Sequence, residues 1–275
     1  MKPRSPATHD NRPIGVFDSG LGGLTVAAAL QRDMPDETII YLGDTARVPY
    51  GSKSRETIIR FALDDAKFLI EREVKLVVAA CNTVSSIAMP ALHKAWPQAR
   101  FIGVVEAGVT QTLVLPDLER VVVIGTEATI ASDSYRLLIH RQHPEIGVRG
   151  IACPLFVPLV EQGWVEGPIA HQICDAYLHD ILAAPPDAVI LGCTHYPLLK
   201  QALRAYLPPS VRIVDSAEAC ASAVGAYLRE HDLTAAPGGN GGRHQYFVTD
   251  MPASFFALAG RFLGQPVRHV DKVSL

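Results

Sequence analysis

Two cysteines stand where a thiol could act on a substrate. Cys81 follows the apolar run "KLVVAA", Cys193 follows "AVILG", and polar residues and a helical pattern come after each of them. Where a cysteine lies between a buried strand and a helix, its reactive thiolate form is favoured, because helix N-terminal amides stabilise negative charge. Most free cysteines instead fill a core as small apolar side chains. We expect that structural role for Cys153, Cys174 and Cys220, and a catalytic role for the first pair.

Polar side chains accompany both of these cysteines. His195 stands two positions after Cys193 in "GCTHYP", so its ring would point to the same side as the thiol if the strand stays extended. The imidazole could then accept or supply a proton beside the thiol. Asn82 and Thr83 follow Cys81 in the same way.

The segment "FDSGLGGLT", residues 17–25, is open to three interpretations. A dinucleotide-binding loop would need glycine at position 25, where the chain has threonine, and Asp18 would repel a pyrophosphate. Asp44, at the end of the next strand, keeps a nicotinamide-dependent reductase as an alternative. Asp18 and Ser19 could simply cap the first helix. They could also serve an amino-acid ligand, with Asp18 near an ammonium or a catalytic thiol and Ser19 on a carboxylate.

Composition and spacing argue against several other classes. Cys81, Cys193 and His195 could supply three zinc ligands, but the chain lacks CxxC, HxxxH and paired cysteine spacing, so we expect no metal. The 25 basic and 28 acidic residues form no basic stripe, which argues against nucleic acid. The five cysteines are widely spaced and are predicted to be free thiols. No signal-peptide pattern and no apolar run of about 18 residues is found, so we predict a cytoplasmic protein without a membrane span.

These polar residues end the strands of a repeating strand–helix pattern. A parallel-sheet α/β fold with helices on both faces is predicted, and its ligands would gather at the C-terminal strand ends. Helices are expected from about Leu24 to Arg32, through "SSIAMPALHKAW", and along a face formed by Ile58, Ala62, Ala66 and Leu69. Residues 234–244, "TAAPGGNGGRH", are expected to be a mobile loop. Strands are expected in "PIGVFDSG", "ETIIYLGD", "KLVVAACNT", "RFIGVVE", "ERVVVIGTEATI", "GVRGIACP", "DAVILGC" and "SVRIVDS".

The two halves of the chain look like copies of one unit. Aligning "LVVAACNTVSSIAMPAL" with "AVILGCTHYPLLKQAL" places Cys81 on Cys193, and aligning "IGVFDSGLGGLTV" with "VVIGTEATIASDS" places Asp18 on Thr126. Two similar α/β units would then face each other about a pseudo-two-fold axis. The two cysteine segments would meet in the cleft between the units.

Together these residues resemble the glutamate racemases, the cofactor-independent enzymes of the aspartate/glutamate racemase family. The resemblance covers residues 14–263 and is carried by "FDSGLGGL", "VPYG", "ACNT", "GVVEAG", "GTEATIxS", "CPLFVPLVEQG" and "GCTHYPLL". It implies two α/β domains with the active site between them. A second domain of residues 100–208 would be inserted into a first domain of residues 1–99 and 209–275.

The resemblance also implies roles for individual residues. Cys81 would take the α-proton of D-glutamate with help from Asp18, and Cys193 would take that of L-glutamate with help from His195, oriented by Glu161. The implied substrate-binding residues are Asp18, Ser19, Tyr50, Gly51, Asn82, Thr83, Thr126, Thr129, Thr194 and His195. No cofactor is implied, and the product would supply peptidoglycan synthesis.

Some questions stay open at this point. The segments "CNTVSS" and "FVTDMPASF" depart from the family pattern, which leaves the C-terminal rim without an assigned role. An aspartate or hydantoin racemase and a noncatalytic amino-acid-binding protein are the alternatives to a glutamate racemase. The oligomeric state is open, and a homodimer is one alternative.

Overall fold

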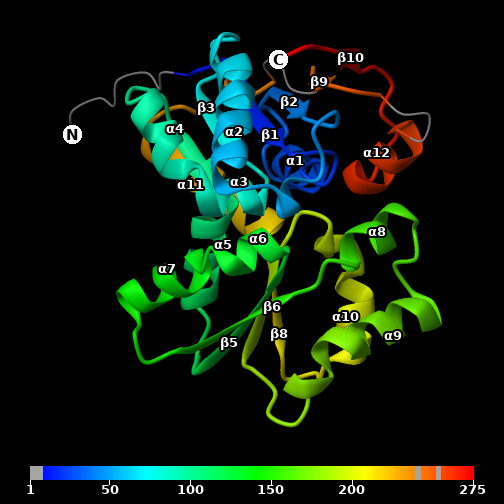
Figure 1. Ribbon diagram of the computed structural model, residues 1–275. Coiled ribbons are helices and arrows are strands. Elements are labelled where there is room, and N and C mark those ends of the chain that lie inside the picture. The colour runs from blue at the N-terminus through cyan, green and yellow to red at the C-terminus, as the bar shows by residue number, and fades with distance from the viewer. Residues whose placement is uncertain (1–8, 239–242, 252–254) are drawn as a thin grey trace.

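Helices surround two parallel β-sheets in the computed structural model, which describes residues 9–238, 243–251 and 255–275 (Figure 1). Over these residues, the larger sheet has the order β10-β9-β2-β1-β3-β4 and the smaller sheet the order β6-β5-β7-β8. All neighbouring strands are parallel, so the predicted fold class is confirmed. The strands are β1 Ile14–Asp18, β2 Ile39–Gly43, β3 Leu76–Ala79, β4 Phe101–Gly103, β5 Arg120–Gly125, β6 Gly147–Ala152, β7 Ala188–Gly192, β8 Arg212–Asp215, β9 Gln245–Val248 and β10 Asp271–Lys272.

The helices connect these strands and bury their apolar faces on the sheets. Ile58, Ala62, Ala66 and Leu69 of α2 are all buried, as their spacing predicts. The helices and 3₁₀ turns are α1 Leu24–Asp33, η1 Tyr50–Ser52, α2 Arg55–Ile70, α3 Asn82–Ile87, α4 Met89–Ala95, α5 Val104–Leu113, α6 Glu127–Ala131, α7 Ser134–Gln142, α8 Phe156–Glu161, α9 Gly167–Leu178, η2 His179–Ile181, η3 Tyr196–Leu199, α10 Lys200–Tyr206, α11 Ser216–Glu230 and α12 Phe255–Leu263.

The strand order repeats between the two sheets. β2-β1-β3-β4 in the larger sheet and β6-β5-β7-β8 in the smaller sheet have the same sequence of crossovers. The strands before Cys81 and Cys193, β3 and β7, hold the same place in this order. The strand order therefore agrees with the internal duplication seen in the sequence.

Several predicted element boundaries are wrong. The strand expected through "ERVVVIGTEATI" ends at Gly125, and α6 begins at Glu127. The single helix expected through "SSIAMPALHKAW" is two helices, because Pro90 has no N–H to bond the Ser86 carbonyl. That carbonyl instead accepts a 2.8 Å hydrogen bond from the Ser134 hydroxyl. The strand expected through "RFIGVVE" ends at Gly103, and α5 begins at Val104.

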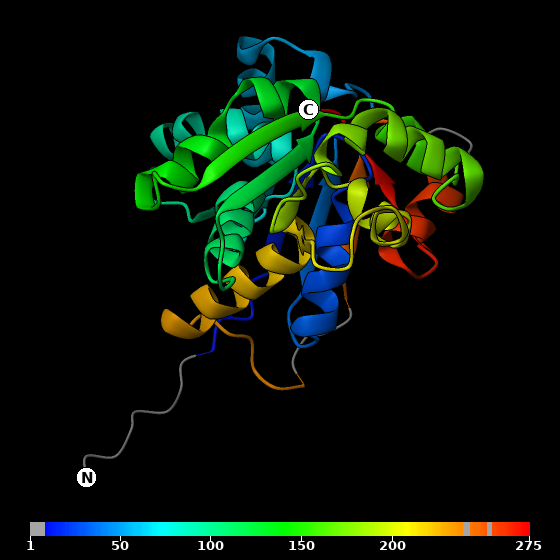
Figure 2. The same ribbon diagram turned by 90° about the horizontal axis from the view of Figure 1, so that it is seen from below.

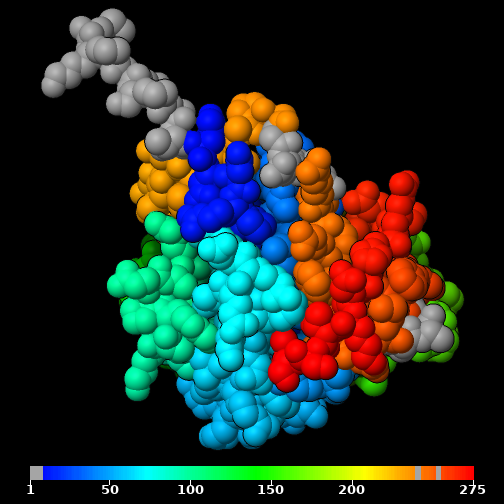
Figure 3. Space-filling model, turned by 90° about the horizontal axis from the view of Figure 1, so that it is seen from above, coloured from blue at the N-terminus to red at the C-terminus, as the bar shows by residue number. Residues whose placement is uncertain are grey.

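The C-terminal elements β9, α12 and β10 were not predicted from the sequence. β9 pairs with β2, β10 extends the larger sheet beyond it, and Phe247 packs against Phe68 of α2 with ring centroids 5.2 Å apart. In the space-filling view the C-terminal residues, orange to red, lie beside the blue to cyan residues of the N-terminal part of the chain (Figure 3). Residues 239–242 of the predicted mobile loop and residues 252–254 of the C-terminal rim lie outside the described residues.

The chain passes between the two sheets along α5 and α11, which pack side by side (Figure 2). β4, at 101–103, belongs to the larger sheet, and β8, at 212–215, belongs to the smaller one. Each predicted boundary therefore lies one strand before the change of sheet, so that β4 is assigned to the inserted domain and β8 to the first domain. The division into domains of 1–99 with 209–275 and 100–208 stays a prediction.

A buried ion pair joins four distant segments of the chain near the N-terminal ends of β1, β2 and β3. Lys75 Nζ lies 2.5 Å from Glu37 Oε2 and donates to the carbonyls of Asp10 and Leu233 at 2.7 and 2.8 Å. We expect Lys75→Met to lower the free energy of unfolding by about 3 kcal/mol, since it leaves the Glu37 charge buried and unpaired.

Urea denaturation measures that loss. Lys67→Met is the control, because Lys67 pairs with Glu71 at the surface, where such a pair contributes at most about 1 kcal/mol. Equal effects of the two substitutions would contradict the prediction.

Candidate functional site

A cavity of about 400 Å³ lies where the C-terminal strand ends of both sheets come together. Residues after β1, β2 and β3 line one side, and residues after β5, β6 and β7 line the other. The lining residues are Ser19, Gly20, Leu21, Thr45, Val48, Pro49, Tyr50, Gly51, Ser52, Cys81, Asn82, Thr83, Thr126, Glu127, Pro154, Val157, Pro158, Glu161, Cys193, Thr194, His195 and Leu258. Every predicted site residue belongs to this lining except Asp18 and Thr129, which lie directly behind it.

Cys81 lies at the junction of β3 and α3. It is the N-cap residue of α3 and is 5% exposed. Its Sγ lies 3.5 Å from Ser19 Oγ, and the Val84 amide acts to lower its pKa. The thiol therefore meets both a hydroxyl and a helix amide, as a strand-to-helix position predicts.

Cys193 contacts His195 through a turn and not through an extended strand. β7 ends at Gly192, His195 has helical backbone angles, and the Tyr196 amide donates to the Cys193 carbonyl at 3.1 Å. The expected extended geometry is therefore wrong, but the side chains still meet, with Sγ 4.0 Å from Nδ1. His195 Nε2 lies 3.2 Å from Glu161 Oε1. Glu161 is therefore placed beside His195, as the resemblance implies.

Burial outweighs the helix amides at both thiols. It raises the pKa of Cys81 to about 11, with a further rise from the Asp18 carboxylate. Burial likewise raises the pKa of Cys193 well above the ordinary value, and Cys81 and Asp18 contribute in the same direction. The helix amides, which the sequence predicts to favour the thiolate, therefore do not by themselves make either thiol acidic. Each thiolate, once formed, is a correspondingly stronger base.

Asp18 is a buried carboxyl group with one oxygen left unpaired. Oδ2 accepts a 3.0 Å hydrogen bond from the Gly20 amide, whereas Oδ1 has no hydrogen-bond partner in the described part of the chain. Burial raises the pKa of Asp18, against the opposing effect of the Gly23 amide and of His195. The capping interpretation is wrong, because Gly23 is the N-cap of α1 and no side chain bonds there.

The glycines after Asp18 allow the two halves of the chain to approach closely. A Cβ at Gly22 would lie 2.3 Å from Thr194 Oγ1 and 2.5 Å from His195 Nδ1. The Thr25 hydroxyl adds a 3.1 Å hydrogen bond to the Thr194 carbonyl. This loop is packed against protein, so its glycines have a role that requires no phosphate.

Hydroxyl groups join the two halves on the other side of the cavity. Thr83 Oγ1 lies 3.0 Å from Thr126 Oγ1 and 3.3 Å from Thr129 Oγ1. Thr129 is 1% exposed, so it supports the other two threonines from behind. Gly51 fits against Thr126, where an added Cβ would approach within 2.9 Å. Hydroxyls and amides are therefore the polar groups that this wall offers to a ligand.

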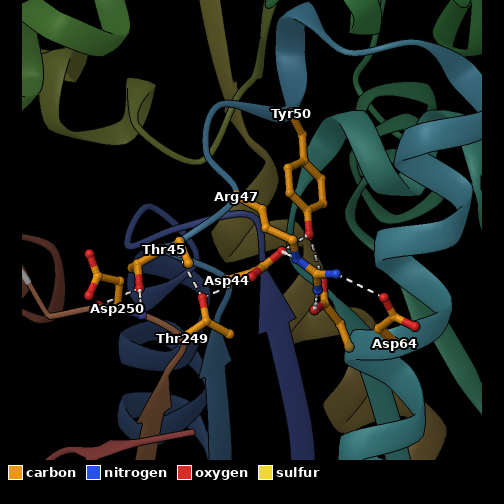
Figure 4. A network of polar contacts seen from close by, with 9 residues as sticks. Asp44, Thr45, Arg47, Tyr50, Asp64, Thr249 and Asp250 are labelled. Carbon is orange, nitrogen blue, oxygen red and sulfur yellow. Dashed lines mark hydrogen bonds and ion pairs between the residues drawn. The ribbon is translucent and has the colours of Figure 1, made fainter. Parts of the chain in front are cut away.

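Tyr50 lines the cavity but directs its hydroxyl into a buried network (Figure 4). That hydroxyl donates to Asp44 and, at 3.1 Å, to Asp65. Arg47 bonds the same two carboxylates, at 2.5 and 3.1 Å, and Asp64 at 2.8 Å. Burial and the Asp44 charge raise the pKa of Asp65. Asp44 also accepts from Thr249 at 2.9 Å, so its oxygens are used within the protein and not for a ribose.

Arg47 anchors the cavity-lining segment 48–52 through this network. We expect Arg47→Lys to lower the free energy of unfolding by about 1.5–3 kcal/mol, because an ammonium cannot bond three carboxylates with fixed planar geometry. The substrate KM should rise as the segment loosens. Thermal melts and steady-state kinetics measure both effects. Arg60→Lys is the control, since Arg60 is exposed and stacks on the same Phe61 ring as Arg47. Wild-type stability and KM in Arg47→Lys would contradict this role.

Tyr135 joins the site without any signal in the sequence. Its hydroxyl donates to Asn82 Oδ1 at 2.6 Å, and Asn82 Nδ2 has no hydrogen-bond partner within the described ranges. Within the described part of the chain, no cluster of three or more His, Cys, Asp or Glu side chains could hold a metal ion. No described helix is long and apolar enough to cross a membrane.

Fold and site together define an α/β protein with two similar units and a thiol from each in one cavity. The profile of the Asp/Glu/Hydantoin racemase family matches residues 24–224, and the chain belongs to this family and is a racemase.

Known glutamate racemases match it over all or nearly all of their length. A glutamate racemase of Geobacter metallireducens is 46% identical over 96% of this chain and 97% of that protein. One of Syntrophus aciditrophicus is 43% identical over all of both chains. The crystal structure of the Francisella tularensis glutamate racemase in complex with D-glutamate superposes with a TM-score of 0.89 at 41% identity, covering 96% of this chain and 98% of that one.

Proposed function

We propose that this chain interconverts L- and D-glutamate by proton transfer between two cysteines and the α-carbon, without a cofactor. The observation that carries the proposal is that Cys81 and Cys193, at the ends of β3 and β7, line one cavity. The similarity to glutamate racemases along the whole chain supports glutamate as the substrate. The enzyme would act in the cytoplasm and supply D-glutamate for peptidoglycan synthesis.

Inversion at the α-carbon needs an acid and a base on opposite faces of the substrate. One cysteine is thiolate and takes the α-proton, which leaves a planar carbanion. The other cysteine is a thiol and gives its proton to the opposite face. The first is now thiol and the second thiolate, so the reverse reaction exchanges their roles. By this proposal Cys81 acts on D-glutamate and Cys193 on L-glutamate.

Neighbouring groups prepare the two thiols for this exchange. Asp18 lies behind Ser19, and the Asp18 charge raises the pKa of Cys81. Asp18 is therefore suited to draw the proton from the Cys81 thiol and to make the Cys81 thiolate a stronger base. His195 contacts Cys193 and is held by Glu161. A substrate ammonium in the same cavity would stabilise whichever thiolate forms.

Neutral donors would bind the substrate carboxylates. The described residues lining the cavity include no lysine or arginine. Ser19, Asn82, Thr83, Thr126 and Thr194 and nearby backbone amides are the groups available. Preorganised donors of this kind can also stabilise carbanion charge without pyridoxal phosphate.

The proposal is tested by optical rotation of L-glutamate incubated with the purified protein. Decay of the rotation to zero is expected, and it should survive exhaustive dialysis and carbonyl reagents. Faster racemisation of aspartate or a hydantoin would indicate an aspartate or hydantoin racemase of the same family. Binding of glutamate without α-proton exchange would favour a noncatalytic protein, and dependence on a nicotinamide would favour a reductase.

A further inference from the structure

Tyr135 contacts the segments next to both thiols. It is the second residue of α7, on the smaller sheet, and is 3% exposed. Its hydroxyl bonds Asn82, the residue after Cys81, at 2.6 Å. Its ring lies against Gly192, the residue before Cys193, where an added Cβ would stand 3.3 Å from Cε2. The opposite ring edge, at Cε1, faces Gly108 of α5.

The tyrosine hydroxyl determines how the Asn82 side chain is oriented. Asn82 is 2% exposed and lines the cavity, and its Oδ1 is occupied by Tyr135. The amide Nδ2 is buried and has no partner among the described residues. A buried N–H donor without an acceptor is costly, so this group suits an anionic oxygen of a ligand in the cavity.

We propose that Tyr135 is a positioning residue that orients the Asn82 amide toward a substrate carboxylate. It also holds the segments next to Cys81 and Cys193 in fixed positions relative to each other. This rests on the proposed racemase function. Burial, and secondarily the nearby Cys193, raises the pKa of Tyr135, so the phenol stays protonated and remains a donor to Oδ1. Without the tyrosine hydroxyl, the Asn82 side-chain amide can rotate, and Nδ2 no longer points toward the substrate carboxylate.

The test compares Tyr135→Phe with Ser134→Ala. Ser134 precedes Tyr135 and also bonds α3, through the Ser86 carbonyl at 2.8 Å, but does not touch Asn82. We expect Tyr135→Phe to raise KM for both glutamate enantiomers about 10-fold. This factor corresponds to the lower end of the free energy lost with a hydrogen bond to a charged group. The kcat should stay within about threefold of wild type. Ser134→Ala should leave both constants near wild type, while both variants lose similar thermal stability. Equal kinetics in the two variants would overturn the proposal.

A double-mutant cycle separates positioning from a general structural role. If Tyr135 acts through Asn82, adding Tyr135→Phe to Asn82→Ala should leave KM unchanged, and fully additive effects would overturn the proposal. Asn82→Asp is the second variant, for use if Tyr135→Phe does not fold. It keeps an acceptor for Tyr135 but replaces the free N–H by oxygen, so KM should rise, and an unchanged KM would overturn the proposal. Wild-type protein that fails to racemise glutamate would instead refute the proposed function.

Discussion

Cys193→Ser and Cys81→Ser are each expected to lower kcat for glutamate racemisation by about 10³-fold. A serine hydroxyl ionises far less readily than a thiol, so it cannot serve as the base at the α-carbon. Both enantiomers have the same free energy in solution. Each variant must therefore lose kcat/KM by the same factor in the two directions, whichever thiol acts first on a given enantiomer.

Cys220→Ser is the control for this pair. Cys220 is buried like the other two, but it lies in α11 and is not part of the cavity lining. Its loss should reduce thermal stability and leave kcat within a few-fold of wild type. Circular dichroism of all three variants establishes that they are folded. Wild-type kcat in either Cys81→Ser or Cys193→Ser would remove that thiol from the reaction.

Asp18→Asn is expected to abolish most activity and yet stabilise the ligand-free protein. An amide cannot draw a proton from Cys81, so kcat should fall about 10²-fold or more. Above the raised pKa of Asp18 the substitution also removes a buried charge with an unpaired oxygen, which should add about 1–3 kcal/mol to the free energy of unfolding.

The pH dependence of this gain follows from the direction of the pKa shift. The pKa of Asp18 is raised by burial, so the folded state favours the neutral carboxyl more than the unfolded state does. The wild type loses stability as the pH rises through that raised pKa, whereas the asparagine variant does not. Thermal melts across the acidic to neutral range should show the variant's advantage shrinking as the pH falls. A variant less stable than wild type above that pKa would contradict this account of Asp18.

The strands and most side chains of the cavity were predictable because each depends on local sequence. Apolar runs ending in polar residues marked β1, β3 and β7, and parallel strands bring such ends to one edge. Ser19, Cys81 and His195 were thus found from their neighbours. Glu161 was implied only by the resemblance, since nothing near it in "VEQG" indicates an interaction with a histidine 34 residues away.

The remaining parts of the site depend on long-range packing. Tyr135 and Asn82 are 53 residues apart, and no periodicity predicts their hydrogen bond. The Arg47–Asp65 pair joins a loop to the middle of α2, where a charged residue would ordinarily face solvent. From the sequence, Gly22 resembles part of a nucleotide-binding loop. A glycine is required there because Gly22 packs against Thr194 and His195, which lie in the other half of the chain.

The central claim is that two different thiols exchange protons with opposite faces of one carbon. The most direct test is L-glutamate racemisation in D₂O, stopped at early conversion, with the deuterium content of each enantiomer measured separately. The account predicts α-deuterium in the D-glutamate product and almost none in recovered L-glutamate, because the thiol that removes a proton is not the one that delivers deuterium. Equal deuterium in product and recovered substrate from the first turnovers would contradict it, since a single base would then serve both faces.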